Sequence, residues 1–465
     1  MGNVMRKIFT AFAFEVFALA LCAGAAGMGA RRAGAAAQSA AQHVVANQMP
    51  GADLGAKINA ADSALGARAG EIWVYPARGP AGSIDTQVTV GSRHTLRFFA
   101  GVYPSNYQAG SDGIIRLKSG ASAVGSGWDT ILRESSRAFQ RQSDNPWTVF
   151  INYDGSVDND AATDNIHISN LKIEGATPSY GSVKQAISLG NCRGCSVEHV
   201  WLRGTKSIGI QAGGGSGHGY FASDVTIANN KLEWVASQAL ACVNCSNVSF
   251  LRNNVVTPGP LTAEGNPPGN VPIDIEPNSS SDVMTNVQIS DNVVDASGGA
   301  TWCGGSICTL NGIMIQNGVG IPAGRYSVSV TNNRVIGSNI ADTMSHISGA
   351  GIWVVAAPNT KVVGNYVQRT MDGIKVTSAQ NFTLEHNEIV STGFTANYAL
   401  LIEGTNVSGV VSNNIVRVDP HSPYQAGEDN LIVETATSGA GVTYSSNSAG
   451  GVKLSLPRSR VVGTR

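Results

Sequence analysis

VSVTNNRV, residues 328–335, is the clearest copy of a phrase that recurs through the chain: a short alternating apolar run, an asparagine and an apolar residue or pair. Other copies begin at residues 225, 248, 287, 361, 382 and 409. The asparagines that we align are Asn230, Asn254, Asn292, Asn333, Asn365, Asn387 and Asn414. Their successive separations are 24, 38, 41, 32, 22 and 27 residues. A unit in the low twenties with insertions at one point is typical of a β-solenoid coil.

A second strand lies between these phrases in every coil. Examples are IDIE (273–276), IMIQ (313–316), IWVV (352–355), IKVT (374–377) and LLIE (400–403). Their period of two predicts strands whose inward residues build one continuous core. The asparagines then fall at a bend, where Asn tolerates left-handed backbone angles and can hydrogen-bond to its stacked copies. A β-propeller would need a period near 40–50 residues, which the shorter units exclude.

The N-terminal part resembles the opening of the pectate-lyase-like superfamily. A Gly-Ala-Asp start at 51–53 leads into an Ala-rich helix at 55–66 and a first strand, and the segments 88–105 and 113–135 resemble that family's first coils. With the later repeats the resemblance covers about residues 50–450. It implies an all-β fold, a right-handed parallel β-helix, with the helix capping the open N-terminal end. That fold carries lyases, hydrolases, epimerases and adhesins, so it does not settle the chemistry.

The N-terminus is expected to direct export. Arg6 and Lys7 precede an apolar stretch at 8–26, and Ala35-Ala36-Ala37 offers a cleavage site. No other segment approaches the ~20 apolar residues needed to span a bilayer. We therefore expect a signal peptide at 1–37, a linker at 38–50, a β-helix domain at 51–455, and a secreted protein, extracellular or periplasmic.

Charge and composition restrict the partners. The formal net charge is −1 and charged residues make up 14% of the chain. Nucleic-acid binding would need a basic stripe, and the sequence has none. A polysaccharide or oligosaccharide is the expected partner.

The six cysteines that follow Cys22 suggest disulfides, because they are even in number and the chain is expected to be exported. Cys303 and Cys308 close a small glycine-containing loop and are the favoured pair. The CxxC pairs Cys192/Cys195 and Cys242/Cys245 would alternatively suit zinc, although they lack the context of a zinc knuckle.

Aligning the second strands brings polar residues onto one outward face. The first outward row is expected to read Ser188, Gly209, Ala241, Asp274, Met314, Trp353, Lys375, Leu401 and Ile432, and the second Gly190, Gln211, Val243, Glu276, Gln316, Val355, Thr377, Glu403 and Glu434. Asp274 and Glu276 are the candidate catalytic pair, since two carboxylates in different environments can divide acid and base work on a glycosidic bond. Their spacing along the strand favours the separation of an inverting glycosidase. The residues expected to bind substrate are Gln211, Gln316, Trp353, Lys375 and Glu403.

Other activities remain open at this point. A uronate lyase would use Lys375 to neutralise the sugar carboxylate, with calcium held by Asp274 and Asp372. The acids Asp154, Asp158 and Asp160 would also suit calcium, but no cofactor is required for hydrolysis. VDPHS at 418–422 is similar to an Asp-Pro-His motif of alginate C5-epimerases. A non-catalytic glycan-binding adhesin is the remaining alternative.

Overall fold

A computed structural model describes residues 42–107, 113–135, 147–153, 162–175, 183–214, 220–235, 237–256, 271–295, 311–337, 349–370, 372–391, 398–418, 432–434, 441–449 and 452–454. The signal peptide expected at 1–37 lies outside these residues. No helix among them is long and apolar enough to cross a membrane.

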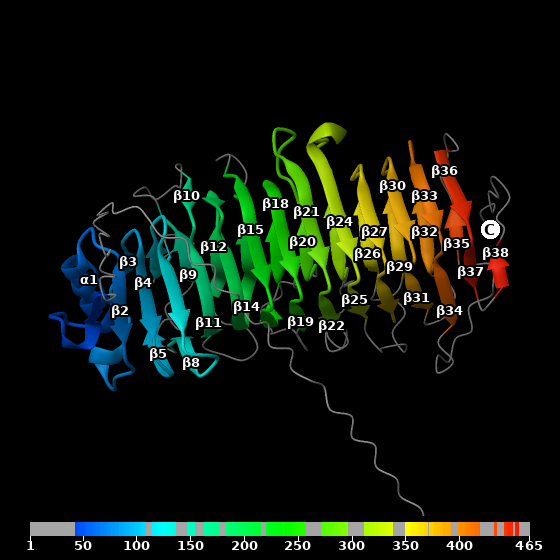
Figure 1. Cartoon of the computed structure of the whole chain (residues 1–465). Helices are drawn as coiled ribbons and strands as arrows, with labels where there is room; N and C mark the ends of the chain where they lie inside the picture. The colour runs from blue at the N-terminus through cyan, green and yellow to red at the C-terminus, as the bar shows by residue number, and fades with distance from the viewer. Residues whose placement is uncertain are drawn as a thin grey trace, which may run out of the picture. The chain divides into compact units, whose positions relative to one another are not determined.

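The described strands stack into three columns of parallel strands, and from β3 onward the described coils contribute strands to all three columns (Figure 1). The first column consists of β3 (Val88–Val90), β6 (Ile115–Leu117), β9 (Trp147–Asn152), β12 (Val183–Leu189), the end of β14 (Ser196–Ala212), β17 (Leu240–Cys242), β20 (Ile273–Ile275), β23 (Ile313–Gln316), β26 (Ala350–Val355), β29 (Asp372–Thr377), β32 (Leu400–Glu403) and β35 (Ile432–Glu434).

The second column follows the alternating runs of the repeated phrase. It consists of β1 (Gln42–Val45), β2 (Gly70–Val74), β4 (His94–Phe98), β7 (Ser122–Gly125), the starts of β11 (His167–Glu174) and β14, β15 (Ala222–Ala228), β18 (Cys245–Leu251), β21 (Met284–Ser290), β24 (Tyr326–Thr331), β27 (Thr360–Val363), β30 (Phe382–Glu385), β33 (Ser408–Ser412) and β36 (Gly441–Ser445), extended by β10 (Thr163–Asp164) and β13 (Cys192–Arg193). Strand β1 lies in the stretch expected as a linker and pairs along its length with β2.

The third column follows the bend and was not distinguished in the sequence. It consists of β5 (Gly101–Ser105), β8 (Thr130–Glu134), the end of β11, the middle of β14, β16 (Lys231–Val235), β19 (Asn254–Val256), β22 (Val293–Asp295), β25 (Arg334–Ile336), β28 (Tyr366–Gln368), β31 (Glu388–Ser391), β34 (Ile415–Val418) and β37 (Asn447–Ala449). The last strand, β38 (Val452–Leu454), pairs antiparallel with β37, so the expectation of purely parallel pairing fails there.

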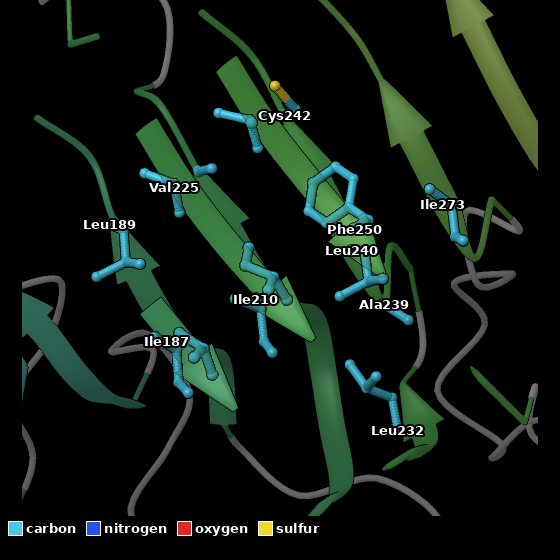
Figure 2. Packing of buried hydrophobic residues seen from close by; sticks show 14 of the residues in the cluster. Ile187, Leu189, Ile210, Val225, Leu232, Ala239, Leu240, Cys242, Phe250 and Ile273 are labelled. Atoms are coloured by element: carbon cyan, nitrogen blue, oxygen red, sulfur yellow. The ribbon is translucent and has the colours of Figure 1, made fainter. Parts of the chain in front are cut away.

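The core is built from inward residues that repeat at the same position of successive strands. Ile187, Ile210, Leu240 and Ile273 are register partners on β12, β14, β17 and β20, and all four are fully buried (Figure 2). Each coil therefore covers the apolar surface of the coil beside it, which is how a solenoid buries a core without a second layer.

Helix α1 (Leu54–Leu65) lies at the N-terminal end, one residue from its expected bounds, and packs against β1, β2 and β3. Its apolar face is fully buried, as expected of a capping helix. Asp53 begins the helix: its Oδ1 accepts from the N–H groups of Gly55 and Ala56 at 2.8 and 3.2 Å. Short 3-10 turns lie at Ala46–Gln48, Pro80–Gly82 and Ala323–Arg325.

The asparagines form a buried ladder of amides at the bend between the second and third columns. Each side-chain nitrogen donates to the side-chain oxygen of the next asparagine at 2.9–3.0 Å, through Asn230, Asn253, Asn292, Asn333, Asn365, Asn387, Asn414 and Asn447. The alignment of Asn254 was wrong by one residue, because Asn254 begins β19 and is exposed. The left-handed residue is the one before each rung, such as Asn332 with a φ of 54°.

Candidate active site

The pairing of the first column fixes which side chains share its outward face. The first outward row reads Ser188, Gln211, Ala241, Asp274, Met314, Trp353, Lys375 and Leu401. Gln211 therefore belongs to the first row, where Gly209 was expected. In the last strand of the column the backbone partner of Leu401 is Val433 and not Ile432, as was expected. The second row contains Gln316, Val355, Thr377 and Glu403, as expected.

Asp274 and Glu276 face one shared hydrogen-bond donor. Nε2 of Gln238, in the turn before β17, donates to Oδ2 of Asp274 at 2.5 Å and to Oε2 of Glu276 at 3.1 Å. The two carboxyl groups are therefore closer than the ~6.5–9.5 Å at which inverting glycosidases hold their acid and base. The separation expected from the strand spacing was wrong, because both side chains turn toward Gln238.

The two carboxyl groups occupy different environments. Asp274 is 2% exposed, whereas Glu276 is half-buried. Burial raises the pKa of Asp274 well above its usual value, the negative charge of Glu276 raises it further, and a hydrogen bond between the two groups adds to both effects. Gln238 and Gln316 act in the opposite direction. Oδ1 of Asp274 is buried and has no hydrogen-bond partner among the described residues.

Gln316 and Gln211 lie at different distances along the column from the carboxylates. Gln316 ends β23, next to β20, and its carbonyl oxygen accepts from the hydroxyl of buried Tyr326 at 2.9 Å. Gln211 is separated from Asp274 by the strand that carries Ala241, and its side-chain oxygen accepts from Gln185. Gln316 thus belongs to the carboxylate cluster and Gln211 to its margin.

Trp353, Lys375 and Glu403 form a second cluster further along the same face. Nζ of Lys375 lies 5.2 Å from the centre of the Trp353 ring and 3.0 Å from Oε1 of Glu403. Thr377 connects them, because its hydroxyl accepts from the Trp353 indole at 3.0 Å and donates to Glu403 at 3.1 Å.

This second cluster does not touch the carboxylate pair. Lys375 stands three strands from Asp274, about 14 Å at the ~4.8 Å spacing of neighbouring strands. The single patch expected from the sequence therefore divides into the pair with its amides and a Trp-Lys-Glu cluster two to four coils away.

The structure contradicts the expectation that Asp274 and Asp372 hold one calcium ion. The two residues lie three strands apart in the same column. Burial raises the pKa of Asp372, while the nearby Lys375 lowers it. In the part of the chain that the structure describes, no group of three or more His, Cys, Asp or Glu side chains could hold a metal ion. The acids Asp154, Asp158 and Asp160, and the histidine of VDPHS, lie outside the described residues.

The cysteines of each CxxC motif are bonded to each other, Cys192 to Cys195 and Cys242 to Cys245. All four are buried, so they contribute to the core and not to a zinc site. The favoured pair, Cys303 and Cys308, lies outside the described residues.

Gln238 is the residue of the site that the sequence did not reveal. It precedes the strand LACV, so the alternation of that strand gave no reason to place it on the outward face. Its offset of three residues from the outward Ala241 is an odd number, so strand alternation would have placed it on the inward face.

Comparison with known proteins agrees with this architecture. The sequence matches no protein-family model, and no curated protein matches it. Among solved structures, the A-module of mannuronan C-5 epimerase AlgE4 from Azotobacter vinelandii aligns over 91% of this chain and 100% of its own, with 14% identity and a TM-score of 0.55. The Dettilon tailspike protein aligns over 86% of this chain and 70% of its own, with 11% identity and a TM-score of 0.56.

A third match is the catalytic unit of a GH87 α-1,3-glucanase from Streptomyces thermodiastaticus. It aligns over 92% of this chain and 72% of its own, with 16% identity and a TM-score of 0.53. Identities this low establish the fold alone. These matches, together with the three columns of parallel strands and the capping helix, confirm the fold expected from the sequence: this chain is a right-handed parallel β-helix protein.

Proposed function

We propose that this protein hydrolyses glycosidic bonds of a polysaccharide, with Asp274 and Glu276 acting together as its acid–base pair. The observation that carries the proposal is the buried carboxyl of Asp274 beside the half-exposed carboxyl of Glu276, both bound to Gln238. Perturbed carboxyl pairs of this kind concentrate at catalytic sites.

The chemistry follows from one proton held by two carboxyl groups. The raised pKa of Asp274 keeps a proton on the pair at a pH where isolated carboxyl groups are ionised. Glu276 is the half-exposed member, so it is the group that can touch the oxygen of a glycosidic bond. Protonation of that oxygen is the general-acid step that every such hydrolysis needs. As the bond from the anomeric carbon to that oxygen breaks, the oxygen takes the proton of Glu276 and water attacks the carbon. The ionised pair takes up the proton that the water loses, and Asp274, behind Glu276, holds and exchanges protons with it.

The rest of the outward face suits a sugar chain. Gln316 offers an amide beside the pair, and Trp353 offers an aromatic ring of the type on which sugar rings pack, at about two strand spacings. Two of the structurally similar proteins carry the names of reactions on polysaccharides, a mannuronan epimerase and an α-1,3-glucanase. The export signal expected at 1–37 would place the reaction outside the cytoplasm.

Elimination from a uronate, or its epimerisation, is the second candidate. Lys375 lies beside Asp372, whose pKa is raised by burial, so a cation and a base lie together on one strand. The ion pair of Lys375 with Glu403 argues against this candidate, because it already neutralises the cation that a sugar carboxylate would need.

Incubation with a panel of plant and bacterial polysaccharides tests the proposal. Reducing ends should appear without the ultraviolet absorbance of unsaturated uronates. Absorbance together with reducing ends would identify a lyase and refute hydrolysis. No new ends from any polymer would leave a binding protein or, if the uronate composition changed, an epimerase.

A further inference from the structure

A second polar and aromatic cluster lies on a different column of the solenoid. It is centred on Trp201 in the middle of β14, and we call it the Trp201 platform, comprising Trp201, Trp128, Lys172, Lys231 and Arg203. These residues belong to the third column and its adjoining turn, whereas Asp274 belongs to the first column. Nothing in the proposed reaction uses them.

Two cations flank the central ring. Lys172, Trp201 and Lys231 are register partners on three neighbouring strands. The ammonium groups of Lys172 and Lys231 lie 4.0 and 4.4 Å from the centre of the Trp201 ring. Contacts of this length are favourable cation–π contacts, so they hold the ring in one orientation.

The second tryptophan is presented to solvent. Trp128 lies in the turn before β8, is 42% exposed, and its ring centre is 5.5 Å from that of Trp201 at an angle of 59°. Its indole N–H donates to the carbonyl of His199 at 2.9 Å, which anchors the side chain. An exposed ring that is fixed in this way can bind without losing much side-chain freedom.

The charge of the surrounding rows is unbalanced. The cations Arg133, Lys172, Arg203 and Lys231 face the carboxylates Glu174 and Glu233 in two neighbouring outward rows. The carboxylates already pair with Lys172, Arg133 and Lys231 at 2.6–2.8 Å. The four cations outnumber the two carboxylates, so the two rows that contain the platform carry excess positive charge.

We propose that the Trp201 platform is a non-catalytic binding site for an acidic polysaccharide, with Trp128 packing on a sugar ring and the excess cations attracting its carboxylates. Ring packing and charge together select a polymer that has both sugar faces and negative groups. This goes beyond the proposed hydrolysis, because the platform would hold a polymer independently of bond cleavage.

Affinity electrophoresis through gels that contain polygalacturonate or alginate tests the proposal. The protein carries Glu276→Gln so that cleavage does not remove the ligand, and Trp128→Ala is compared with that background. Highly methyl-esterified pectin is the matched ligand, since esterification removes the charge of polygalacturonate and keeps its backbone. Tyr75→Ala is the matched control, because Tyr75 is an aromatic residue of similar exposure, 38%, outside the platform.

At least one acidic polymer should retard the background protein, and Trp128→Ala should weaken that binding about tenfold, the loss expected for one aromatic contact. Tyr75→Ala should bind like the background, and the esterified polymer should retard none of the proteins strongly. Equal retardation with and without Trp128, or equal binding of esterified and free polymer, would overturn the proposal, as would no retardation by either acid. The assay measures binding and not cleavage. The proposal of hydrolysis can therefore be refuted while the binding proposal is supported, and the binding proposal can be refuted while hydrolysis is supported.

Discussion

Replacement of Asn253 by alanine should destabilise the solenoid strongly, while replacement of its neighbour Asn254 should not. Oδ1 of Asn253 accepts from the backbone N–H and the side-chain nitrogen of Asn230, both at 3.0 Å. Alanine leaves two N–H groups of Asn230 unpaired, the backbone one and one of the two on the side-chain nitrogen, which still donates to the Val197 carbonyl at 3.0 Å. Both asparagines are 1% exposed. Each buried unpaired group costs about 1–3 kcal/mol, so the loss should be about 2–6 kcal/mol. Asn292 limits the damage, because its Oδ1 still accepts from the Asn253 backbone at 2.8 Å.

Asn254 is the matched control because it is the same residue type, one position along, and exposed. Asn254→Ala should change the free energy of unfolding by no more than about 0.5 kcal/mol. Denaturant midpoints of the two variants measure the contrast. Hydrogen exchange at the Asn230 amide supplies a local readout, which should accelerate only in Asn253→Ala. Equal midpoints, or a larger loss for Asn254→Ala, would refute the ladder as the stabilising element of the bend.

Three further perturbations have defined outcomes. Because the pKa of Asp274 is raised in the folded chain, its ionisation costs stability as the pH rises from about 4, the unfolded value, through the folded pKa. Asp274→Asn should therefore melt at a higher temperature than the parent at pH 7 and at a similar one below about pH 4, and a pH-independent difference would contradict this. Asp53→Ala removes the cap of α1 and a 2.6 Å hydrogen bond from Thr86, so it should cost at least about 1 kcal/mol at pH 7. Burial raises the pKa of Asp53, but its hydrogen bonds, led by the one from Thr86, lower it by more. The loss of stability caused by Asp53→Ala should therefore shrink as the pH falls and the carboxylate of the parent is protonated. An unchanged loss at low pH would argue against an ionised cap. Lys375→Met should leave the rate of hydrolysis largely intact. It should lower the free energy of unfolding by no more than about 1 kcal/mol, since the ion pair of Lys375 with Glu403 is partly exposed. Abolished turnover would favour the lyase mechanism.

The strand pattern was readable from the sequence because a solenoid repeats its alternation in every coil. The first-column strands and the outward positions of Asp274, Trp353 and Lys375 follow from that alternation alone. The ladder residue next to Asn254 was not distinguishable, because two adjacent asparagines in RNNVV fit the same phrase. Only the bend geometry, with the left-handed residue at Arg252, selects Asn253.

The chemistry of the site was harder to read because it depends on side-chain directions. Strand geometry predicted that the carboxyl groups of Asp274 and Glu276 stand apart by the spacing of alternate residues on a strand. In the structure both carboxyl groups turn toward Gln238, a donor from the neighbouring coil, and so lie closer together. Gln238 lies in a turn, where period-two alternation carries no information about facing. The outward face divides into two clusters because two to four coils separate the carboxylate pair from Trp353, Lys375 and Glu403. Insertions between the repeats make that number of coils hard to count in the sequence.

Turnover of the polysaccharide identified by the panel, compared between the parent and the two carboxylate variants, tests the proposed pair most directly. Glu276→Gln and Asp274→Asn should each lower the initial rate of reducing-end release by about 10²–10⁴-fold. The double variant should be little slower than either, because residues that act as a unit are not additive. Glu388→Gln, a partly exposed carboxylate of the third column, serves as the control and should match the parent. A near-parental rate in either single variant, or losses that multiply in the double variant, would contradict an acid–base pair at Asp274 and Glu276.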